Sequence, residues 1–366
     1  MLTVGVLFGG RSGEHDVSLC SAASVVAAMD PSRYNVVAIG IDRDGRWYVQ
    51  DSPVIVDDRD FGRILKLEKK GNWFVNHFED GNRLVLFDAD SNRKVSVDVV
   101  FPAVHGTYCE DGTLQGLLEL AMVPYVGADS VGSSIGIDKD VTKRLLRDGG
   151  IPVVPWVTIF KDEWDRDTET ILNAIKENIP LPLFVKPART GSSVGVKKVK
   201  AHGELAGAID FAFQYDTKLL IEKGIDAREI ECSVLGNNEP MASVPGEVRT
   251  RHEFYSYESK YIDPDGAELV IPAAIDDAVS ASIRAAAVEG YRILCCGGMA
   301  RVDFFLDKNT GEYFLNEINT LPGFTSISMY PKLWAHSGLE YPALIDRLIE
   351  LAIERHRARA GIRTRI

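Results

Sequence analysis

The sequence predicts a mixed α/β and α+β protein whose N-terminal part is a parallel sheet covered by helices. Two continuous apolar segments, 4–8 and 36–41, flank a helical segment at about 17–29. This pattern is typical of parallel strands that are buried on both faces. Towards the other end of the chain, strand-like segments at 300–306 and 312–318 predict an antiparallel hairpin. The chain therefore combines sheets of different kinds.

Length, composition and charge restrict the class of protein. The 366 residues predict two to three domains, at about 150 residues each. Lys and Arg total 41 against 53 Asp and Glu, which gives a net charge of −12 and argues against nucleic-acid binding, since that requires a basic surface. No apolar run approaches the roughly 18 residues needed to cross a bilayer. We expect a cytoplasmic, multidomain enzyme without a membrane or nucleic-acid partner.

The other N-terminal elements continue the parallel pattern after an interruption. Residues 51–96 are more polar and predict a strand-and-loop insertion, with turns at Gly71-Asn72 and Gly81-Asn82. The parallel pattern resumes at 97–102, and we expect residues 125–127 to form its last strand.

The second half begins with a charged helix at 138–147, which Gly149 and Gly150 end. Strands at 183–187 and 219–222 complete a compact α+β unit. A closing helix is predicted from apolar residues that recur at helical spacing, namely Leu344, Leu348, Leu351 and Ala352. We expect its arginine-rich end (Arg355, Arg357, Arg359, Arg363 and Arg365) to be solvated and placed favourably against the helix dipole.

The predicted hairpin carries the strongest chemical signal. Side chains alternate along a strand, so Arg301 and Asp303 share one face, and Glu317 and Asn319 share one face of the partner strand. Two carboxylates and an amide oxygen suit Mg²⁺, which takes oxygen ligands, waters and substrate phosphates. The alternative is a charged strand pair on a solvated face.

A loop rich in glycine and serine follows the strand that ends near Lys186. This Gly/Ser loop (residues 188–195) could bring backbone N–H groups and the Ser192 and Ser193 hydroxyls to phosphate oxygens. It lacks the Gly-Lys-Ser/Thr of a Walker loop, and the glycines at 9–13 do not match the GxGxxG fingerprint. A plain flexible hairpin is the alternative, but the ammonium of Lys186 on an apolar strand favours phosphate.

Two polar groups follow parallel strands and are expected at the same sheet edge. Glu14 lies at a strand-to-helix turn, and His105 follows the strand at 97–102. Ligands bind beyond the carboxyl ends of such strands, where Glu14 could hold a substrate ammonium. The alternatives are a first-turn carboxylate that the helix dipole stabilises and a structural histidine.

Taken together, these segments resemble the D-alanine–D-alanine ligase family of the ATP-grasp superfamily. The matching motifs occur in order over nearly the whole chain: Gly9-Gly10 with Glu14-His15-Asp16-Val17-Ser18, His105-Gly106 with Glu110-Asp111-Gly112, Asp138-Lys139 with Lys143, Val185-Lys186-Pro187 with Gly191-Ser192-Ser193-Val194-Gly195, Glu222-Lys223, Glu253-Phe254-Tyr255 with Tyr257, Lys260-Tyr261, Arg301-Val302-Asp303, Asn316-Glu317-Ile318-Asn319-Thr320 and Pro322-Gly323-Phe324-Thr325-Ser326.

The resemblance implies an ATP-grasp fold with an N-terminal pre-ATP-grasp (Rossmann-like) parallel-sheet domain at 1–137. A central subdomain at 138–222 would carry the phosphate-covering loop, and a C-terminal subdomain at 223–366 the metal and oxyanion sites. It also implies a reaction in which ATP phosphorylates one D-alanine and the amine of a second D-alanine attacks the acyl phosphate. The dipeptide would serve peptidoglycan synthesis. A ligase that uses D-lactate, or another carboxylate–amine ligase, is the alternative within the fold; a nucleotide-binding module without activity is the alternative outside it.

The same resemblance implies residue roles. Those implied for ATP are phosphate contacts by Lys139, Lys186 and Lys260, a lid made by Ser192 and Ser193, and nucleotide contacts by Glu222, Lys223, Ile225, Glu229 and Phe254. At Gly224 the sequence departs from the larger residue common in the family, which puts the adenine contacts in doubt. Asp303, Glu317 and Asn319 would hold two Mg²⁺ ions, with Mn²⁺ as a substitute.

For the amino-acid substrates, the resemblance implies that Glu14 anchors the first ammonium, with His105 near its carboxylate. Arg301 and the Gly323 backbone would form an oxyanion site, and Ser328 would hold the second carboxylate. Glu14, Ser192 and Tyr261 would form a hydrogen-bonded triad that orders the lid, and Tyr261 bears on the choice of second substrate. The family also implies a homodimer.

Overall fold

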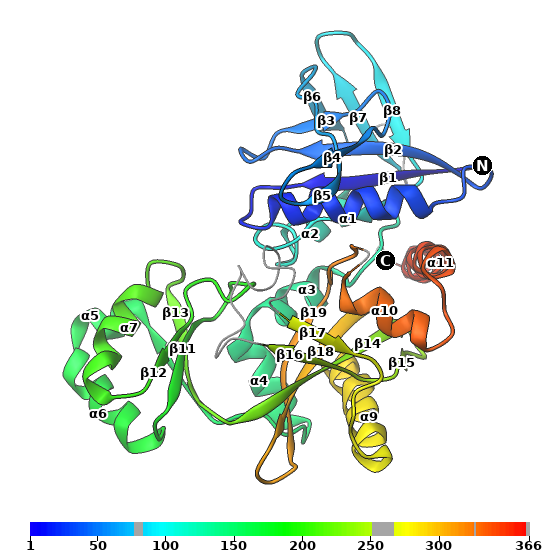
Figure 1. Cartoon of the computed structure of the whole chain (residues 1–366). Coiled ribbons are helices and arrows are strands. Elements are labelled where there is room, and N and C mark those ends of the chain that lie inside the picture. Colours follow the sequence, from blue (N-terminus) through cyan, green and yellow to red (C-terminus); the bar gives the residue numbers. More distant parts are fainter. Residues whose placement is uncertain (77–82, 251–266, 326, 364–366) are drawn as a thin grey trace.

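The computed structural model describes residues 1–76, 83–250, 267–325 and 327–363. Figure 1 shows three groups of strands, which belong to the N-terminal, central and C-terminal parts of the chain.

The N-terminal sheet is the parallel sheet that the sequence predicts. Its strand order is β3-β2-β1-β9, in which β1 pairs in parallel with both β2 and β9, and β3 is an antiparallel edge. The side chains of Val4, Val6, Leu7 and Phe8 are fully buried, which explains the continuous apolar run. The bounds are β1 (Leu2–Gly9), α1 (His15–Ala28), β2 (Tyr34–Ile41), β3 (Trp47–Val49), β9 (Val99–Pro102) and α2 (Thr113–Leu120).

The insertion between β3 and β9, predicted as strands and loops, contains two small antiparallel sheets. The first is the hairpin of β4 (Ile55–Asp58) and β5 (Gly62–Leu65), and the second has the order β6-β7-β8, with β6 (Trp73–Asn76), β7 (Leu84–Asp88) and β8 (Lys94–Val97). The turn expected at Gly81-Asn82 lies outside the described residues. The strand expected at 125–127 is wrong: Tyr125 makes only an isolated bridge to Val100, because the chain turns away after one ladder pair.

The central sheet has the order β10-β13-β11-β12 and is antiparallel throughout. Leu183, Val185, Leu219 and Ile221 pack on one face against helices that include α5, α6 and α7. Strand alternation therefore sends Lys186 and Glu222 to the opposite face. The bounds are α3 (Ser130–Ile137), α4 (Lys139–Asp148), β10 (Trp156–Phe160), α5 (Lys161–Arg166), α6 (Thr168–Asn178), β11 (Leu183–Pro187), β12 (Lys197–Val199), η1 (His202–Glu204), α7 (Leu205–Ala212) and β13 (Lys218–Lys223).

The C-terminal sheet has the order β17-β16-β14-β18-β19, with β15 beside β14, and contains the predicted hairpin as β18 and β19. Helix α9 covers one face through Ile283, Ala287 and Tyr291. The bounds are β14 (Ala227–Gly236), β15 (Met241–Ala242), β16 (Gly246–Thr250), β17 (Ala267–Val270), α9 (Asp277–Ile293), β18 (Gly298–Asp307), β19 (Tyr313–Asn319), α10 (Met329–His336) and α11 (Tyr341–Ala360).

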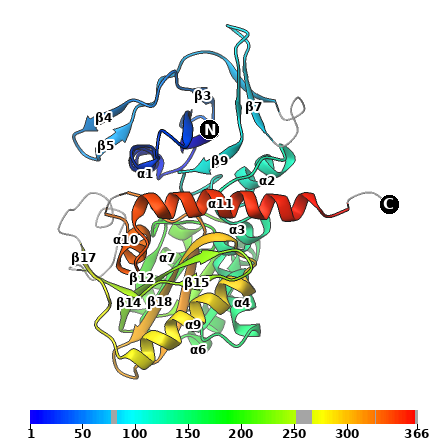
Figure 2. The same ribbon diagram turned by 90° about the vertical axis from the view of Figure 1, so that its right-hand side faces the viewer.

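The last helix, α11, packs against the N-terminal core. The predicted apolar face is buried, but its Leu344 and Leu348 belong to the same core as the N-terminal sheet. Figure 2 shows α11 lying between the N-terminal strands and the C-terminal sheet.

The arginine-rich end of α11 is not simply solvated, which corrects the expectation for it. Arg355 donates hydrogen bonds to the Tyr125 and Gly127 carbonyls, and Arg359 pairs with Glu119 and Asp129. These contacts tie the helix end to the N-terminal part.

Candidate active site

The Gly/Ser loop contacts the first helix through a hydrogen bond between two predicted site residues. Ser192 Oγ donates to Glu14 Oε1 at 2.5 Å, although the residues lie 178 positions apart. Ser192 and Ser193 have φ values of 50° and 59°, in the left-handed region. Glu14 is the N-cap residue of α1, but its side chain makes no capping hydrogen bond, so the carboxylate is directed to the loop instead. Tyr261, the third member of the expected triad, lies outside the described residues.

Space around the Glu14 carboxylate depends on a glycine. Gly106 has φ +79°, and a Cβ there would lie 2.7 Å from Glu14 Oε2. Any larger residue would displace the carboxylate or strain the backbone. The His105-Gly106 segment after β9 and Glu14 before α1 therefore lie close together at one edge of the sheet, as expected.

His105 is buried and held at both ring nitrogens. Nδ1 lies 3.0 Å from the Leu321 carbonyl oxygen, and Nε2 lies 2.8 Å from Ser21 Oγ. Burial lowers the pKa of the imidazole, which keeps it neutral, and the Leu321 carbonyl then requires the proton to be on Nδ1. The Phe324 N–H donates to Ser21 Oγ at 3.4 Å, which links His105 to the loop that contains Gly323.

Glu110 is a buried acid near His105 for which the sequence predicted no role. Its Oε1 lies 4.0 Å from His105 Nδ1, and its side chain is only 13% exposed. Burial and, second, the charge of Glu14 raise the pKa of Glu110 well above the ordinary carboxyl value. The only sequence signal was its place in the Glu110-Asp111-Gly112 motif.

The β18–β19 hairpin brings the predicted metal residues together on one face. Arg301 pairs in register with Asn319, and Asp303 with Glu317. Arg301 Nε and Nη2 donate to the two Asp303 oxygens at 2.7 and 2.6 Å, and Asn319 Nδ2 donates to Asp303 Oδ2 at 3.0 Å. The polar face of the hairpin is therefore half-buried and internally hydrogen-bonded, unlike a solvated strand pair.

Arg301 has a second acidic partner that the sequence analysis missed. Its Nε lies 2.9 Å from Oε2 of Glu231, which is buried on β14 opposite Asp303. Burial acts to lower the pKa of the guanidinium, but Asp303 and Glu231 outweigh it and raise the pKa well above its ordinary value. Arg301 thus stays charged, with a second carboxylate to hold it.

The donor set on this face fits a magnesium ion. Asp303 and Glu317 supply carboxylate oxygens, and Asn319 supplies an amide oxygen once its side chain is turned. Within the described ranges no three His, Cys, Asp or Glu side chains form a metal-binding cluster, so the candidate rests on these two carboxylates and one amide. Lys139 Nζ lies 3.9 Å from Glu317 Oε2 and donates to the Thr190 carbonyl at 2.7 Å, which joins the hairpin to the Gly/Ser loop.

Lys186 and Glu222 form a buried ionic cluster with a third residue, Lys143. Glu222 Oε1 pairs with Lys186 Nζ, and Glu222 Oε2 lies 2.7 Å from Lys143 Nζ. Burial acts to raise the pKa of Glu222, but the two ammonium groups outweigh it and lower the pKa to about 2. The carboxylate expected at adenine is thus engaged by two lysines. Lys186 Nζ also lies 5.7 Å from the Phe305 ring on β18, between the two sheets.

The remaining predicted residues fall into three groups. Gly323 and Ser328 are close, since a Cβ on Gly323 would lie 2.9 Å from Ser328 Oγ, and Ser328 Oγ accepts from the Thr325 N–H at 3.0 Å. Lys223 is exposed at the end of β13, while Ile225 is half-buried just before β14 and Glu229 is half-buried within it. Phe254 and Lys260 lie outside the described residues.

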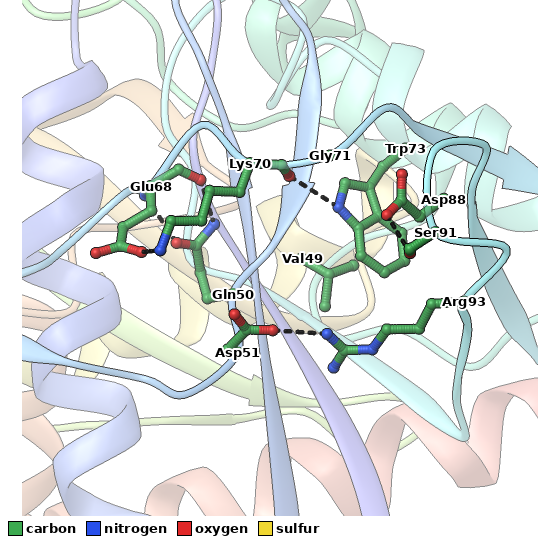
Figure 3. Close-up of a pocket in the computed structure, with 10 residues that line it drawn as sticks. All are labelled: Val49, Gln50, Asp51, Glu68, Lys70, Gly71, Trp73, Asp88, Ser91 and Arg93. Carbon is green, nitrogen blue, oxygen red and sulfur yellow. Dashed lines mark hydrogen bonds and ion pairs between the residues drawn. The ribbon is translucent and has the colours of Figure 1, made fainter.

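A separate pocket of about 280 Å³ lies in the N-terminal insertion (Figure 3). Its charged groups are already paired, with Arg93 on Asp51 at 2.6 Å and Lys70 on Glu68 at 2.6 Å. The buried Gln50 side chain is also satisfied, since it donates to the Tyr48 and Glu68 carbonyls and accepts from the Glu68 N–H. None of the predicted site residues lines this pocket. The candidate active site is therefore the cluster around Glu14, Arg301 and Lys186.

Among the described helices, none has the length and apolar character needed to span a membrane.

Comparisons with known proteins identify the family of the chain. Models described as the N-terminus and C-terminus of D-Ala D-Ala ligase match residues 3–128 and 145–350. The D-alanine–D-alanine ligase A of Escherichia coli strain K12 is 49% identical over 364 residues, which is 99% of both chains.

Solved structures give the same result. The D-alanine–D-alanine ligase of Coxiella burnetii aligns with a TM-score of 0.80 and 39% identity over 98% of this chain and 97% of the other. The VanG D-Ala:D-Ser ligase of Enterococcus faecalis aligns with a TM-score of 0.81 and 35% identity over 96% and 99%. The predicted ATP-grasp fold with an N-terminal parallel-sheet domain is confirmed. This chain belongs to the D-alanine–D-alanine ligase family.

Proposed function

We propose that this protein ligates two D-alanine molecules to D-alanyl-D-alanine at the expense of ATP, in the cytoplasm, for peptidoglycan precursor synthesis. The observation that carries the proposal is the Ser192–Glu14 hydrogen bond, which joins a phosphate-type loop to an acid suited to an amino-acid ammonium. A site that binds both ATP and an amino acid needs such a junction.

In the first step, a carboxylate oxygen of D-alanine attacks the γ-phosphorus of ATP, the bond to ADP breaks, and an acyl phosphate forms. Glu14 binds the D-alanine ammonium, and His105, neutral and buried, orients its carboxylate. Lys139, Lys186 and Lys260 neutralise the phosphates, while Glu222, Lys223, Ile225, Glu229 and Phe254 surround the nucleoside. Asp303, Glu317 and Asn319 would hold two Mg²⁺ ions, with Mn²⁺ as a substitute, and these supply charge neutralisation at the transferring phosphoryl group.

In the second step, the amine of the second D-alanine attacks the acyl carbon and phosphate leaves. Arg301 stays charged between Asp303 and Glu231, and together with the Gly323 N–H it stabilises the oxyanion of the tetrahedral intermediate. Ser328, adjacent to Gly323, binds the second carboxylate. The Gly/Ser loop excludes water, which would otherwise hydrolyse the acyl phosphate. The role proposed for Tyr261 is to complete the hydrogen-bonded triad with Glu14 and Ser192.

The organisation of the chain is part of the proposal. The domains are 1–137, 138–222 and 223–366, with the site in the cleft that they share, and two chains form a homodimer. The sheets support the division, since each of the three main sheets falls within one range, apart from the last residue of β13.

The test is ATP turnover with each acceptor in turn. With D-alanine alone, we expect phosphate release and D-alanyl-D-alanine as the identified product. D-Serine and D-lactate are offered beside D-alanine, because one structural relative is a D-Ala:D-Ser ligase. Absence of D-alanine-dependent phosphate release would overturn the proposal, and a requirement for D-serine or D-lactate would replace the second substrate.

A further inference from the structure

Lys143 is a fully buried lysine to which the proposed mechanism gives no task. Its side chain is 1% exposed, and the proposed mechanism assigns it no contact with the nucleotide. It lies on α4 one turn after Lys139, and its Nζ reaches Glu222 at 2.7 Å and the Val154 carbonyl at 3.3 Å. Burying an ammonium group is unfavourable in free energy unless the charge is paired. Among the described residues, Glu222 is the only carboxylate that pairs with Lys143, so the function of Lys143 is to be sought in this pair.

The charges of the cluster do not cancel. The amino groups of Lys143 and Lys186 both face the single carboxylate of Glu222. Burial lowers the pKa of Lys143, while the Glu222 carboxylate acts to raise it and so favours the charged ammonium. The Glu222 pKa of about 2 keeps that carboxylate ionised at neutral pH. Lys186 is the more exposed of the two lysines, at 12%, and it lies on the sheet face opposite to the central helices.

We propose that Lys143 is a positioning residue: by sharing the Glu222 carboxylate with Lys186, it leaves one unit of positive charge directed at the nucleotide phosphates. Without Lys143, Glu222 and Lys186 become a neutral pair, and the phosphates lose that attraction. The inference rests on the proposed role of Lys186 at the phosphates and extends it to a residue that binds no substrate.

The test compares ligands that share adenosine and differ in the number of their phosphate groups. Adenosine, AMP, ADP and ATP are titrated into the full chain by calorimetry at fixed Mg²⁺ and without D-alanine. For Lys143→Met we expect ATP to bind about tenfold more weakly or worse. The loss of affinity in Lys143→Met should be smaller for ADP and smaller still for AMP. Adenosine should bind to this variant within about twofold of its affinity for wild type. Lys143→Arg keeps the charge and should bind ATP within about threefold of wild type.

A double variant separates charge from structure. Lys143→Met with Glu222→Gln removes one charge of each sign, so Lys186 is again unneutralised. We expect it to bind ATP more tightly than Lys143→Met alone. Replacing a buried ion pair by neutral groups is often tolerated, so this variant should also fold. If Lys143→Met does not fold, Lys143→Gln carries the same comparison, because its amide can still donate to Glu222.

Two results would overturn the inference. One is an equal loss for adenosine and ATP, which would make Lys143 a structural residue. The other is a double variant that binds ATP no better than the single neutral variant. Both results are independent of the ligation assay, in which wild-type dipeptide formation tests the proposed function.

Discussion

Replacing Ser192 by alanine removes the hydroxyl that joins the Gly/Ser loop to Glu14. The bond is 2.5 Å long and its acceptor is a carboxylate, and hydrogen bonds to charged groups contribute about 1.5–3 kcal/mol. Both side chains are half-buried, so we expect the lower end of that range, about 1.5 kcal/mol. This corresponds to about a tenfold shift from the closed to the open loop.

An open loop admits water to the acyl phosphate, so ADP formation and dipeptide formation become uncoupled. We expect wild type to form one dipeptide per ADP, and Ser192→Ala to release excess ADP, most clearly at low concentrations of the second D-alanine. Val194→Ala is the matched control, because it changes an exposed side chain of the same loop and leaves the Ser192–Glu14 bond in place. If Ser192→Ala keeps a ratio of one and the wild-type rate, the loop does not protect the intermediate.

Three further predictions concern stability, metal and pH. Leu348→Ala should lower the free energy of unfolding by about 2–5 kcal/mol in urea titrations, because Leu348 is fully buried in the N-terminal core. Arg357 is exposed on the same helix, so Arg357→Ala should change the free energy of unfolding by less than about 0.5 kcal/mol. Equal effects of the two substitutions would contradict the packing of α11. Glu317→Gln should raise the Mg²⁺ concentration for half-maximal turnover and weaken direct Mg²⁺ binding, and unchanged values would remove Glu317 from the metal site. Folding lowers the pKa of Glu222 from 4.5 to about 2, so the ionised carboxylate stabilises the folded state above pH 4.5, and this stabilisation is lost as the pH falls towards 2. The difference in melting temperature between wild type and Glu222→Gln should therefore shrink below pH 4.5. A constant difference from pH 7 to 3 would contradict the pairing of Glu222 with Lys143 and Lys186.

Local periodicity predicted the hairpin and the faces of its side chains, with Arg301 and Asp303 on one face of the first strand and Glu317 and Asn319 on one face of the second. Their pairing across the hairpin depends on a bulge between Asp303 and Phe304, which shifts the register set at the turn and which periodicity did not predict. The same reasoning predicted β1, α1 and β2, because a continuous apolar run between helical segments has few other solutions.

Contacts between distant segments could not be predicted from periodicity. The amphipathic face of α11 is visible in the sequence, but the sequence does not say which core the face joins. The contacts of Arg355 with Tyr125 and Gly127 depend on that packing. The bond from Ser192 to Glu14 likewise was expected only through the family resemblance, since no local rule relates residues 178 positions apart.

The buried ion pairs were the main omission. Glu231 and Lys143 look like ordinary charged residues of a strand and a helix, and charged residues are usually exposed. Their burial follows from the sheets that pack around Arg301 and Glu222. The only sequence signal for Lys143 was its position one turn after Lys139, and no role followed from that position.

In the proposed reaction, one site first activates the D-alanine carboxylate and then transfers the acyl group to a second amine. The most direct measurement uses D-alanine labelled with ¹⁸O in its carboxylate and follows the label into the released phosphate. We expect one ¹⁸O atom in each phosphate together with D-alanyl-D-alanine as product, because attack at the acyl carbon leaves one labelled oxygen on phosphorus. Unlabelled phosphate alongside the dipeptide would contradict an acyl phosphate, and labelled phosphate without dipeptide would contradict ligation to a second D-alanine.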